Sequence, residues 1–532
     1  MTKAKPRVLI SDKISKKGVS ILKKTCTVDV KPGLSEAELI KIIPRYDAQI
    51  VRAATKVTAK VIKAAKNLKI VGRAGVGVDN IDVAAATKAG ILVVNSPEGN
   101  IISAAEQTIA LLMALSRKTP QAYCSMKEGK WEKSKFMGSQ VYQKTLGLVG
   151  FGKIGKLVAE RAIGLGMNVI VSDPYANEEA VEKIGAVMVD QGTLQKESDY
   201  ITFHVPKSKE TYHLCSKDDF KRMKDGVFII NCSRGGVVDE EALVEAIDSG
   251  KVAAAGLDVF EKEPLPADSI LMGHPNIIMT PHLGASTVEA QENVAVDVSI
   301  QISNFLNGKP VTTAVNMPAM KPEVLKLHEP YFNMVEKLGM LLEGLRSSPV
   351  KSVEILYEGE VSKMQTSIIT NYFLLGMMRR RFSDTVNVVN AQILCRERGI
   401  NVVEVSRDEC CDISSESRIT AKLVEKSRER TVAAHLIGGK EPRIDLIDGF
   451  NIDLVPEGTY LLISHTDKPG MIGKVGMLLG ESNINIAGMQ VGREKVRGNA
   501  VMAIAVDDDV PAEMMKKIRK FGGIRSAKLV SF

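Results

Sequence analysis

The chain lacks the cysteine pattern that would indicate a disulfide framework or a zinc site. Its 532 residues include seven cysteines, which is an odd number, at irregular spacings and without a C-x-x-C pair. Long apolar runs are also missing. The richest stretch, Ile109 to Leu115, is seven residues long, whereas a helix needs about 18 apolar residues to cross a bilayer. We therefore expect no metal site, no membrane span and a reducing compartment.

A strong charge of one sign is absent as well. The net charge of +8 is spread over the chain, and most Lys and Arg residues have acidic neighbours. This favours a mixed, solvated surface over nucleic-acid binding, although the positive bias would help to attract anionic substrates. The N-terminus runs directly into the apolar segment Val8–Ile10, which leaves no room for a targeting peptide. We therefore expect a cytoplasmic protein.

Strands and helices alternate in two series over the first 317 residues. Such alternation predicts parallel α/β sheets, and six strands in one series is the count of a dinucleotide-binding sheet. We therefore expect two Rossmann-like, doubly wound domains. The first series is predicted to contain strands at Val8–Ile10, Ala48–Val51, Ile70–Val71 and Ile91–Val94, and the second at Leu146–Gly150, Val169–Ser172, Tyr200–His204, Val227–Asn231, Ala254–Asp258 and Ile277–Met279.

The chain changes character after the linker Asn316-Met317-Pro318. The following region, up to Glu457, is predicted to be α+β, with hairpin turns at Gly438-Gly439-Lys440 and Asp448-Gly449. The last unit, Thr459 to Phe532, has the order strand, helix, strand, strand, helix, strand. At roughly 100–200 residues per domain, the length agrees with three to five domains.

The strongest single motif is the glycine-rich stretch from Gly150 to Gly155, Gly-Phe-Gly-Lys-Ile-Gly, placed between a predicted strand and a predicted helix. Gly150 permits a tight turn, Gly152 lets the backbone approach a pyrophosphate, and Gly155 lets the helix pack closely. The helix N-terminus offers free N–H groups to phosphate. Asp173 follows Gly155 by 18 residues, near the spacing expected for an acid that binds the ribose hydroxyls. Its charge would repel a 2′-phosphate, which favours NAD over NADP.

Three further motifs follow the predicted strands of the second series, at the sheet edge where open α/β sheets place their chemistry. They are Asn231–Gly236, Leu257–Pro264 and Thr280–Thr287. Oxidation of an alcohol next to a carboxylate needs a cation, for which Arg is suited by its two-pronged grip. It also needs a base near neutral pH, for which His is suited, and a carboxylate to orient that base. All three residue types occur in these motifs.

These motifs resemble the D-isomer-specific 2-hydroxyacid dehydrogenase family over residues 1–317. Over its whole length the chain resembles the long-form phosphoglycerate dehydrogenases of that family. The supporting strings are Gly72–Asn80, Lys130-Trp131-Glu132, the glycine-rich loop, Cys232–Asp239 and His282–Thr287. The resemblance implies a substrate-binding domain (1–98 and 287–317), an NAD-binding domain (99–286), an intervening domain (318–457) and an ACT domain (458–532).

The resemblance also implies roles for individual residues. The catalytic trio would be Arg234, Glu263 and His282. The cofactor, NAD, would lie against Gly150, Gly152, Lys153, Ile154, Gly155, Asp173, Val205, Cys232, Ser233, Arg234, Asp258, His282, Leu283, Gly284 and Ala285. The substrate, 3-phospho-D-glycerate, would be held by Arg52, Arg73, Gly75 and Lys56. The family often has Ser where this chain has Ala53, which removes one hydroxyl contact. A homo-oligomer, dimer or tetramer, is also implied.

The last unit resembles the ACT module, which binds amino acids. In serine-regulated relatives one His and two Asn hold L-serine; His465 and Asn485 match two of these, and Asp467 replaces the third. A carboxylate cannot donate an amide hydrogen bond, so a module that only mediates dimerisation stays an alternative. Two further readings stay open for the whole chain: another dehydrogenase of the family, such as a glyoxylate or hydroxypyruvate reductase, or an NAD-sensing corepressor. The residues beyond Asn316 argue against both.

Overall fold

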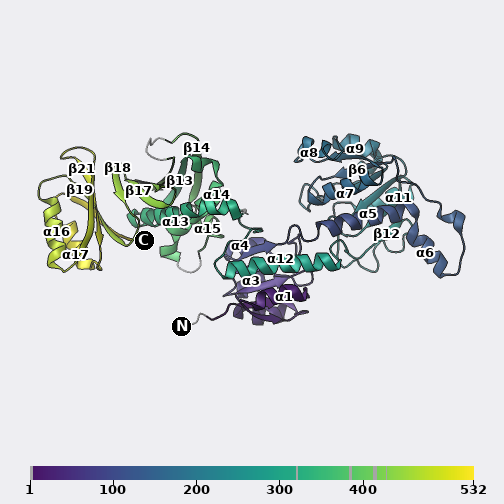
Figure 1. Cartoon of the computed structure of the whole chain (residues 1–532), viewed down its shortest axis with the longest axis horizontal. Helices are drawn as coiled ribbons and strands as arrows, with labels where there is room; N and C mark the ends of the chain where they lie inside the picture. Colours follow the sequence, from purple (N-terminus) through teal and green to yellow (C-terminus); the bar gives the residue numbers. More distant parts are fainter. Residues whose placement is uncertain (1–3, 319–321, 383–385, 411–415, 427) are drawn as a thin grey trace.

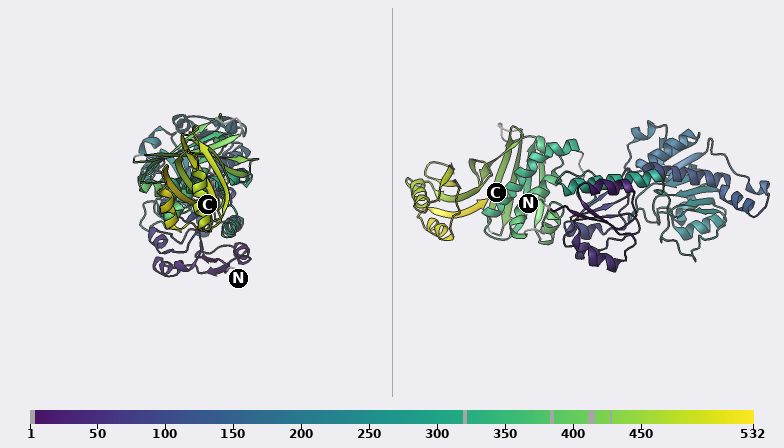
Figure 2. Two further views of the ribbon diagram at one scale, coloured as in Figure 1. Left: turned by 90° about the vertical axis from the view of Figure 1, so that its left-hand side faces the viewer. Right: turned by 60° about the horizontal axis from the view of Figure 1, so that its bottom comes forward.

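The computed structural model describes residues 4–318, 322–382, 386–410, 416–426 and 428–532, so that Cys411 lies outside the described residues. The chain forms four sheets that follow one another along an elongated molecule (Figures 1 and 2). The N-terminal sheet lies in the middle, the second sheet lies at one end, and the third and fourth sheets extend to the other end (Figure 1). Cys26, Cys124, Cys215, Cys232 and Cys395 form no disulfide bonds.

The first sheet contains five parallel strands in the order β2-β1-β3-β4-β5. Every residue of β3 is buried, which is why this strand reads clearly as apolar. Strand β2 was not predicted, because it lies at the sheet edge and none of its residues is fully buried. The elements are β1 (Arg7–Ile10), α1 (Lys16–Lys23), β2 (Thr27–Val30), α2 (Glu36–Ile42), β3 (Ala48–Val51), α3 (Ala59–Ala64), β4 (Ile70–Arg73), α4 (Val83–Lys88) and β5 (Leu92–Asn95).

The second sheet contains seven parallel strands in the order β12-β11-β10-β9-β6-β7-β8. The six predicted strands are present, and the two-residue edge strand β8 is added. The strand order reverses direction at β6, where such sheets bind their ligands. The elements are α5 (Ile101–Arg117), α6 (Thr119–Lys127), β6 (Thr145–Val149), α7 (Lys153–Gly164), β7 (Asn168–Ser172), α8 (Glu178–Glu182), β8 (Val187–Met188), α9 (Gln191–Glu197), β9 (Tyr200–Phe203), α10 (Lys217–Arg222), β10 (Val227–Asn231), α11 (Glu240–Asp248), β11 (Val252–Leu257) and β12 (Ile277–Met279).

Helix α12 (Val288–Leu306) returns the chain from the second sheet to the first. Its buried residues Val298 and Ile302 pack in one core with strands β1, β3, β4 and β5. A side chain at Gly72 in β4 would collide with both of these residues, so the helix lies directly on the sheet. This packing supports the assignment of residues 287–317 to the N-terminal unit, while the domain boundaries themselves stay a prediction.

The third and fourth sheets belong to the C-terminal part of the chain. The third has the order β14-β13-β15-β16-β17-β18 and is mostly antiparallel, and both predicted hairpin turns connect its strands. Its elements are α13 (Pro322–Leu345), β13 (Val350–Gly359), α14 (Thr366–Phe382), α15 (Ala391–Glu397), β14 (Asn401–Arg407), β15 (Ser417–Glu425), β16 (Glu429–Ile437), β17 (Glu441–Ile447) and β18 (Phe450–Leu454).

The fourth sheet has the order β20-β21-β19-β22 and is fully antiparallel. The predicted order of strand, helix, strand, strand, helix, strand is confirmed. Its elements are β19 (Thr459–Thr466), α16 (Met471–Glu481), β20 (Ile486–Arg493), β21 (Asn499–Val506), α17 (Ala512–Arg519) and β22 (Ile524–Ser531). Within the described ranges, no helix has the length and apolar composition that a bilayer crossing requires.

Candidate active site

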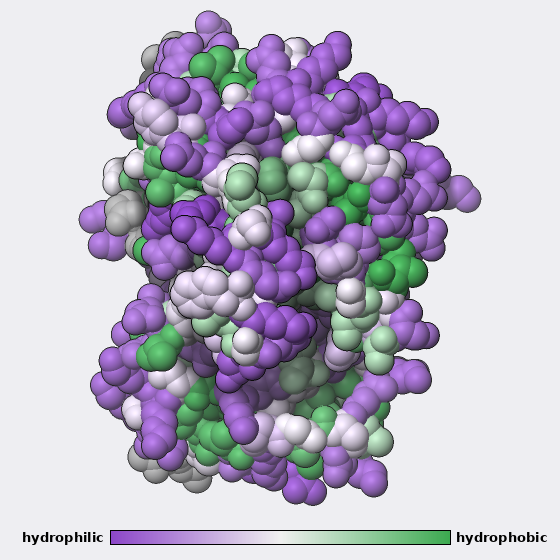
Figure 3. Space-filling view, turned by 90° about the vertical axis from the view of Figure 1, so that its right-hand side faces the viewer, coloured by the Kyte–Doolittle hydropathy of each residue, from purple (hydrophilic) through white to green (hydrophobic). Residues whose placement is uncertain are grey.

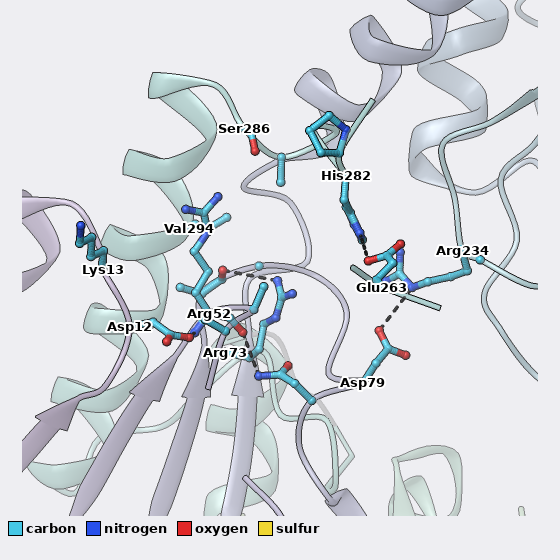
Figure 4. A pocket seen from close by; sticks show the side chains of 18 of the residues that line it. Asp12, Lys13, Arg52, Arg73, Asp79, Arg234, Glu263, His282, Ser286 and Val294 are labelled. Carbon is cyan, nitrogen blue, oxygen red and sulfur yellow. Dashed lines mark hydrogen bonds and ion pairs between the residues drawn. The ribbon is translucent and has the colours of Figure 1, made fainter. Parts of the chain in front are cut away.

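A cavity of about 760 Å³ lies between the first and second sheets. One wall is formed by the loops that follow β1, β3 and β4, and the other by the loops that follow β10, β11 and β12. All six loops leave the carboxyl ends of parallel strands, so the fold brings together side chains that are far apart in the sequence. Both walls carry charged side chains that face the same space (Figure 4).

His282 and Glu263 meet on the wall formed by the second sheet. The distance from His282 Nδ1 to Glu263 Oε2 is 2.7 Å (Figure 4). The other carboxylate oxygen of Glu263 accepts the backbone N–H of Phe260 at 3.1 Å. A carboxylate can only accept, so Nδ1 carries the hydrogen and Nε2 is left as an acceptor toward the cavity. The pair therefore has the geometry of a base with its orienting acid.

Glu263 stays ionised in this setting. Partial burial alone would raise its pKa, but the hydrogen bond and charge of His282, the N–H of Phe260 and the charge of Arg234 outweigh burial. The pKa of Glu263 is therefore lower than the ordinary value of 4.5. A carboxylate next to the imidazole stabilises the imidazolium that forms when the ring takes a proton.

Asp258 holds the loop that carries His282. Its side chain is fully buried. One oxygen accepts the Thr280 hydroxyl at 2.5 Å and the Leu283 N–H at 2.7 Å, and the other accepts the Gly284 N–H at 2.8 Å. The structure thus gives this carboxylate, predicted to contact the cofactor, a loop-positioning role through three protein donors. Leu283 and Gly284 take part by their backbone, and Ala285 lines the cavity.

Arg234 extends from the loop after β10 into the same cavity. The loop is shaped by Asn231, whose side chain accepts the Ser233 N–H at 3.0 Å and donates to the Arg234 carbonyl at 3.0 Å. The Arg234 guanidinium donates to the Ser233 carbonyl at 2.8 Å. Ser233 therefore supports the loop, and Arg234, Glu263 and His282 all face one space (Figure 4).

The opposite wall is cationic. Arg52 and Arg73 lie there together with Gly75 and with Lys13, and Lys207 adds a further cation from the second sheet. Burial and the charges of Arg234 and Arg52 lower the pKa of Arg73 to about 10, against a smaller opposing effect of Asp79 and Asp12. A cation that is destabilised by burial and by like charges gains most from an anionic ligand. The wall is therefore suited to a phosphate or carboxylate group.

Two residues that sequence reasoning missed shape this wall. Buried Asp12 accepts the Arg52 N–H at 2.6 Å and the Thr55 hydroxyl at 2.6 Å, which fixes the loop that carries Arg52. Lys13, which follows it, lines the cavity. The sequence signal that could have identified Asp12 and Lys13 is their position directly after a buried strand. Lys56 was predicted to bind the substrate, but the structure leaves it exposed and outside the cavity lining, because its neighbour Thr55 is the residue that turns inward.

The glycine-rich loop lies at the carboxyl end of β6. Gly150 has a φ of +96°, and a Cβ there would lie 2.6 Å from the His204 carbonyl oxygen and 2.9 Å from Val205. Gly155 packs against this turn at the first helical turn of α7, where Lys153 and Ile154 also lie, and the space around Gly152 is open. The ε-amino group of Lys153 forms an ion pair with Glu98, with 2.6 Å between Nζ and Oε1.

Asp173 lies just beyond β7 beside this loop. Its Oδ2 accepts the Phe151 N–H at 2.7 Å, and its Oδ1 accepts the Tyr175 N–H at 2.8 Å. These bonds place the carboxylate next to the N-terminus of the 12-residue helix α7. Open space at a helix N-terminus, with an acid at the end of the next strand, fits the pyrophosphate and ribose of NAD.

Two other residues near the site are poorly suited to acid–base or nucleophilic chemistry. Burial lowers the pKa of His204 to about 3, so its ring is neutral, and it bonds the Thr202 hydroxyl at 3.1 Å. Burial, with a smaller effect of Asp258, raises the pKa of the Cys232 thiol to about 12. Cys232 is therefore a protonated pocket-lining residue. The low pKa of His204 makes its ring a weak base, which favours His282 as the proton acceptor.

The predicted effector residues lie in the fourth sheet, far from this cavity. His465 and Asp467 line a cavity of about 320 Å³ between β19 and α16. His465 is 1% exposed, and its Nε2 has no hydrogen-bond partner in the described parts of the chain. The structure does not bring Asn485 into this cavity, because its side chain donates to Asp507 at 2.6 Å.

The chain matches three family models over most of its length. The NAD-binding domain of D-isomer-specific 2-hydroxyacid dehydrogenases matches residues 109–284. The D-3-phosphoglycerate dehydrogenase intervening domain matches residues 327–448, and the ACT domain matches residues 459–523.

Known relatives match the whole chain. D-3-phosphoglycerate dehydrogenase of Synechocystis sp. is 47% identical, with 98% of this chain and 94% of the relative covered. The enzyme of the same name from Archaeoglobus fulgidus is 44% identical, with 98% and 99% covered. Among solved structures, a glyoxylate reductase from Paecilomyes thermophila has a TM-score of 0.55 and 29% identity, and covers 59% of this chain and 99% of its own.

A formate dehydrogenase from Staphylococcus aureus in complex with NAD aligns with a TM-score of 0.54 and 29% identity, over 59% of this chain and 99% of its own. Both solved structures are smaller than the chain, whereas the relatives named D-3-phosphoglycerate dehydrogenase extend over all four sheets. The chain therefore belongs to the D-3-phosphoglycerate dehydrogenase family of D-isomer-specific 2-hydroxyacid dehydrogenases.

Proposed function

We propose that this protein is an NAD-dependent D-3-phosphoglycerate dehydrogenase, which oxidises 3-phospho-D-glycerate to 3-phosphohydroxypyruvate in the first step of L-serine biosynthesis. The observation that carries the proposal is the cavity in which Arg234, Glu263 and His282 face the cations Arg52 and Arg73. The catalytic trio is suited to the oxidation of a 2-hydroxy acid. The additional cations suit a substrate that carries a phosphate as well as a carboxylate.

The proton of the substrate's 2-hydroxyl group is taken by His282. Glu263 holds the Nδ1–H of the ring at 2.7 Å, so the Nε2 lone pair faces the substrate and can accept that proton. The imidazolium that results is stabilised by the ionised Glu263 carboxylate. A positioned acid–base group of this kind typically contributes about 10²–10⁴ in rate.

Arg234 orients the substrate and polarises its C2 oxygen. The guanidinium is planar and always charged, so it can hold the carboxylate while it stabilises the developing carbonyl. Arg52 and Arg73 bind the phosphate on the opposite wall. NAD fits at Gly150–Gly155 and Asp173, and when bound it supplies the hydride acceptor for C2. The Asp173 carboxylate repels a 2′-phosphate, which favours NAD over NADP.

The proposal is tested by the absorbance of NADH with purified protein and a panel of 2-hydroxy and 2-oxo acids. Oxidation of 3-phospho-D-glycerate with NAD and reduction of 3-phosphohydroxypyruvate with NADH are expected. Efficient turnover of glyoxylate with none of the phosphorylated substrates would contradict the substrate assignment. Activity with NADP comparable to that with NAD would contradict the cofactor assignment.

The ACT domain is proposed to bind a small amino acid such as L-serine in the cavity lined by His465. Its Nδ1 bonds the Thr466 carbonyl at 3.0 Å, so Nε2 is a buried acceptor that an ammonium or hydroxyl group could satisfy. Calorimetry with L-serine should show binding that His465→Ala abolishes. Asp467→Asn should strengthen the binding, because an amide can donate to the effector carboxylate. If calorimetry shows no heat of binding with any amino acid, the effector proposal is wrong and the ACT domain acts only in dimerisation.

A homo-oligomer, dimer or tetramer, is proposed from an exposed apolar surface. Tyr123, Met126, Trp131, Met137 and Tyr142 are all more than half exposed on α6 and the segment after it, and α6 projects from the end of the molecule (Figure 1). Hydrophobic patches interrupt the polar surface when this end is viewed (Figure 3). Such patches often mark contacts between subunits. Sedimentation should show association that Trp131→Ser weakens, whereas a wild-type monomer would contradict it.

The cytoplasmic location predicted from the sequence stays a prediction. Two plant relatives are chloroplastic by name, so membership of the family does not by itself fix the compartment. Fractionation of the source cells would decide the location.

A further inference from the structure

The guanidinium of Arg234 contacts the N-terminal domain as well as its own loop. Its Nε lies 3.4 Å from Oδ2 of Asp79 (Figure 4). Arg234 follows β10 in the second sheet, whereas Asp79 follows β4 in the first. This ion pair therefore connects the two walls of the cavity through a residue of the proposed catalytic trio.

The loop that contains Asp79 has a space shaped for this guanidinium. A Cβ atom built on Gly77 would lie 2.2 Å from Nη2 of Arg234 and 2.7 Å from Oδ2 of Asp79. Real Cβ atoms do not approach other atoms so closely. The missing side chain at Gly77 therefore lets Arg234 lie against the backbone, where the Asp79 carboxylate reaches its Nε.

The loop is held in place independently of Arg234. The Asn80 side chain donates to the carbonyls of Arg52 at 2.9 Å and Thr55 at 2.6 Å. The Asn95 side chain donates to the Val76 carbonyl at 2.6 Å. Gly77 and Asp79 are therefore fixed on both sides, and they can act as a preformed receptor for a flexible side chain.

Asp79 also offsets the repulsion between the like charges of Arg234 and Arg73. Arg234 faces Arg73, and this like charge lowers the pKa of Arg73, whereas the charge of Asp79 opposes that effect. Glu263 also lies near Arg234, but Arg234 forms its ion pair with Asp79, which draws the guanidinium toward the N-terminal domain against the repulsion of Arg73. With Nε paired to Asp79 and one N–H of Nη1 donating to the Ser233 carbonyl, the second N–H of Nη1 and the N–H groups of Nη2 are left for the ligand.

We propose that Asp79 is a positioning residue for the dehydrogenase reaction, which with Gly77 receives the Arg234 guanidinium from the other domain and sets its orientation toward the substrate. Asp79 itself acts only through Arg234. The inference rests on the proposed function for the choice of substrate alone.

The test compares Asp79→Asn and Gly77→Ala with a matched control, Asp82→Asn. Asp82 lies three residues after Asp79, and its side chain caps α4 by accepting the Ala85 N–H at 2.9 Å. For each variant, kcat and KM for 3-phospho-D-glycerate, the dissociation constant of NAD and Tm are measured. Asp79→Asn is expected to lower kcat by roughly 2- to 5-fold, because the Asp79 side chain is 71% exposed and ion pairs with exposed partners contribute little.

The pattern of constants separates positioning from other roles. The KM for substrate in Asp79→Asn should be unchanged or lower, because a negative charge leaves an anion site, and NAD binding should be unchanged. Asp79→Glu should recover part of kcat. Gly77→Ala should reproduce the loss in kcat, and the double variant should lose less than the product of the two single losses. Asp82→Asn should leave kcat and Tm close to the wild-type values, because asparagine caps a helix about as well as aspartate.

Three outcomes would overturn the inference. A lower KM with full kcat in Asp79→Asn would make Asp79 a bystander charge. A lower Tm with full kcat would give Asp79 a purely structural role. Multiplicative losses in the double variant would show that Gly77 and Asp79 act separately. If the wild type prefers another 2-hydroxy acid, the proposed substrate is wrong, and the same comparison with the preferred acid still tests the role of Asp79.

Discussion

Replacement of His282 by asparagine is expected to lower kcat by about 10²- to 10⁴-fold without disturbing its loop. His282 has a φ of +55°, in the left-handed region that asparagine tolerates better than alanine. The substitution removes the proton acceptor that Glu263 holds at 2.7 Å, whereas Asp258 and its three donors stay in place. A positioned acid–base group contributes about this factor, which corresponds to about 3–5 kcal/mol in the activation barrier.

The assay measures initial rates of NADH formation together with NAD binding by fluorescence. NAD should still bind to His282→Asn, because the glycine-rich loop and Asp173, which hold the pyrophosphate and ribose, are separate from this side chain. His204→Asn is the control, since burial keeps the His204 ring neutral with a pKa of about 3. Near-normal kcat in His282→Asn, or an equal loss in His204→Asn, would refute the assignment of His282 as the base.

Three further predictions follow from contacts in the same region. Asp258→Ala should lower the free energy of unfolding in urea by roughly 2–6 kcal/mol, because it leaves the two backbone N–H groups of Leu283 and Gly284 without partners at about 1–3 kcal/mol each; an unchanged free energy would show that the loop finds other acceptors. Asp173→Ala should narrow the preference of kcat/KM for NAD over NADP, and an unchanged ratio would place the discrimination elsewhere. Because the folded-state pKa of Glu263 is lowered from 4.5, its stabilising contribution is present above that pH and is lost as the pH falls further. The Tm difference between wild type and Glu263→Gln should thus persist at pH 5 and shrink only in more acid solution, and a difference already lost at pH 5 would contradict the lowered pKa.

The central strands of the first two sheets were predictable because they are buried on both faces and read as apolar runs. Strands β2 and β8 were not, because they lie at sheet edges and their residues are partly exposed. The ACT topology could be read from the alternation of its elements. The boundaries of the α+β region depend on packing between distant segments, which a local pattern does not record.

The candidate site likewise contains residues that the sequence predicted and residues that it did not. Motifs after the strands of the second sheet pointed to Arg234, Glu263 and His282, because strand ends of one sheet share an edge. Asp12 and Asp79 were missed because their importance comes from neighbours that are distant in sequence. Lys56 was assigned to the substrate by the family resemblance, yet Thr55 takes the inward position beside Asp12. In each case the deciding contact is tertiary.

The most direct test of the central claim compares kcat/KM for 3-phosphohydroxypyruvate and for hydroxypyruvate in the NADH-dependent reduction. The two compounds differ only by the phosphate that Arg52 and Arg73 are proposed to bind. Two charged hydrogen-bonding partners at about 1.5–3 kcal/mol each predict a preference for the phosphorylated compound of roughly 10²-fold or more, and Arg73→Gln should reduce it. Equal kcat/KM for the two compounds would contradict the claim that this cavity is built for a phosphorylated 2-hydroxy acid.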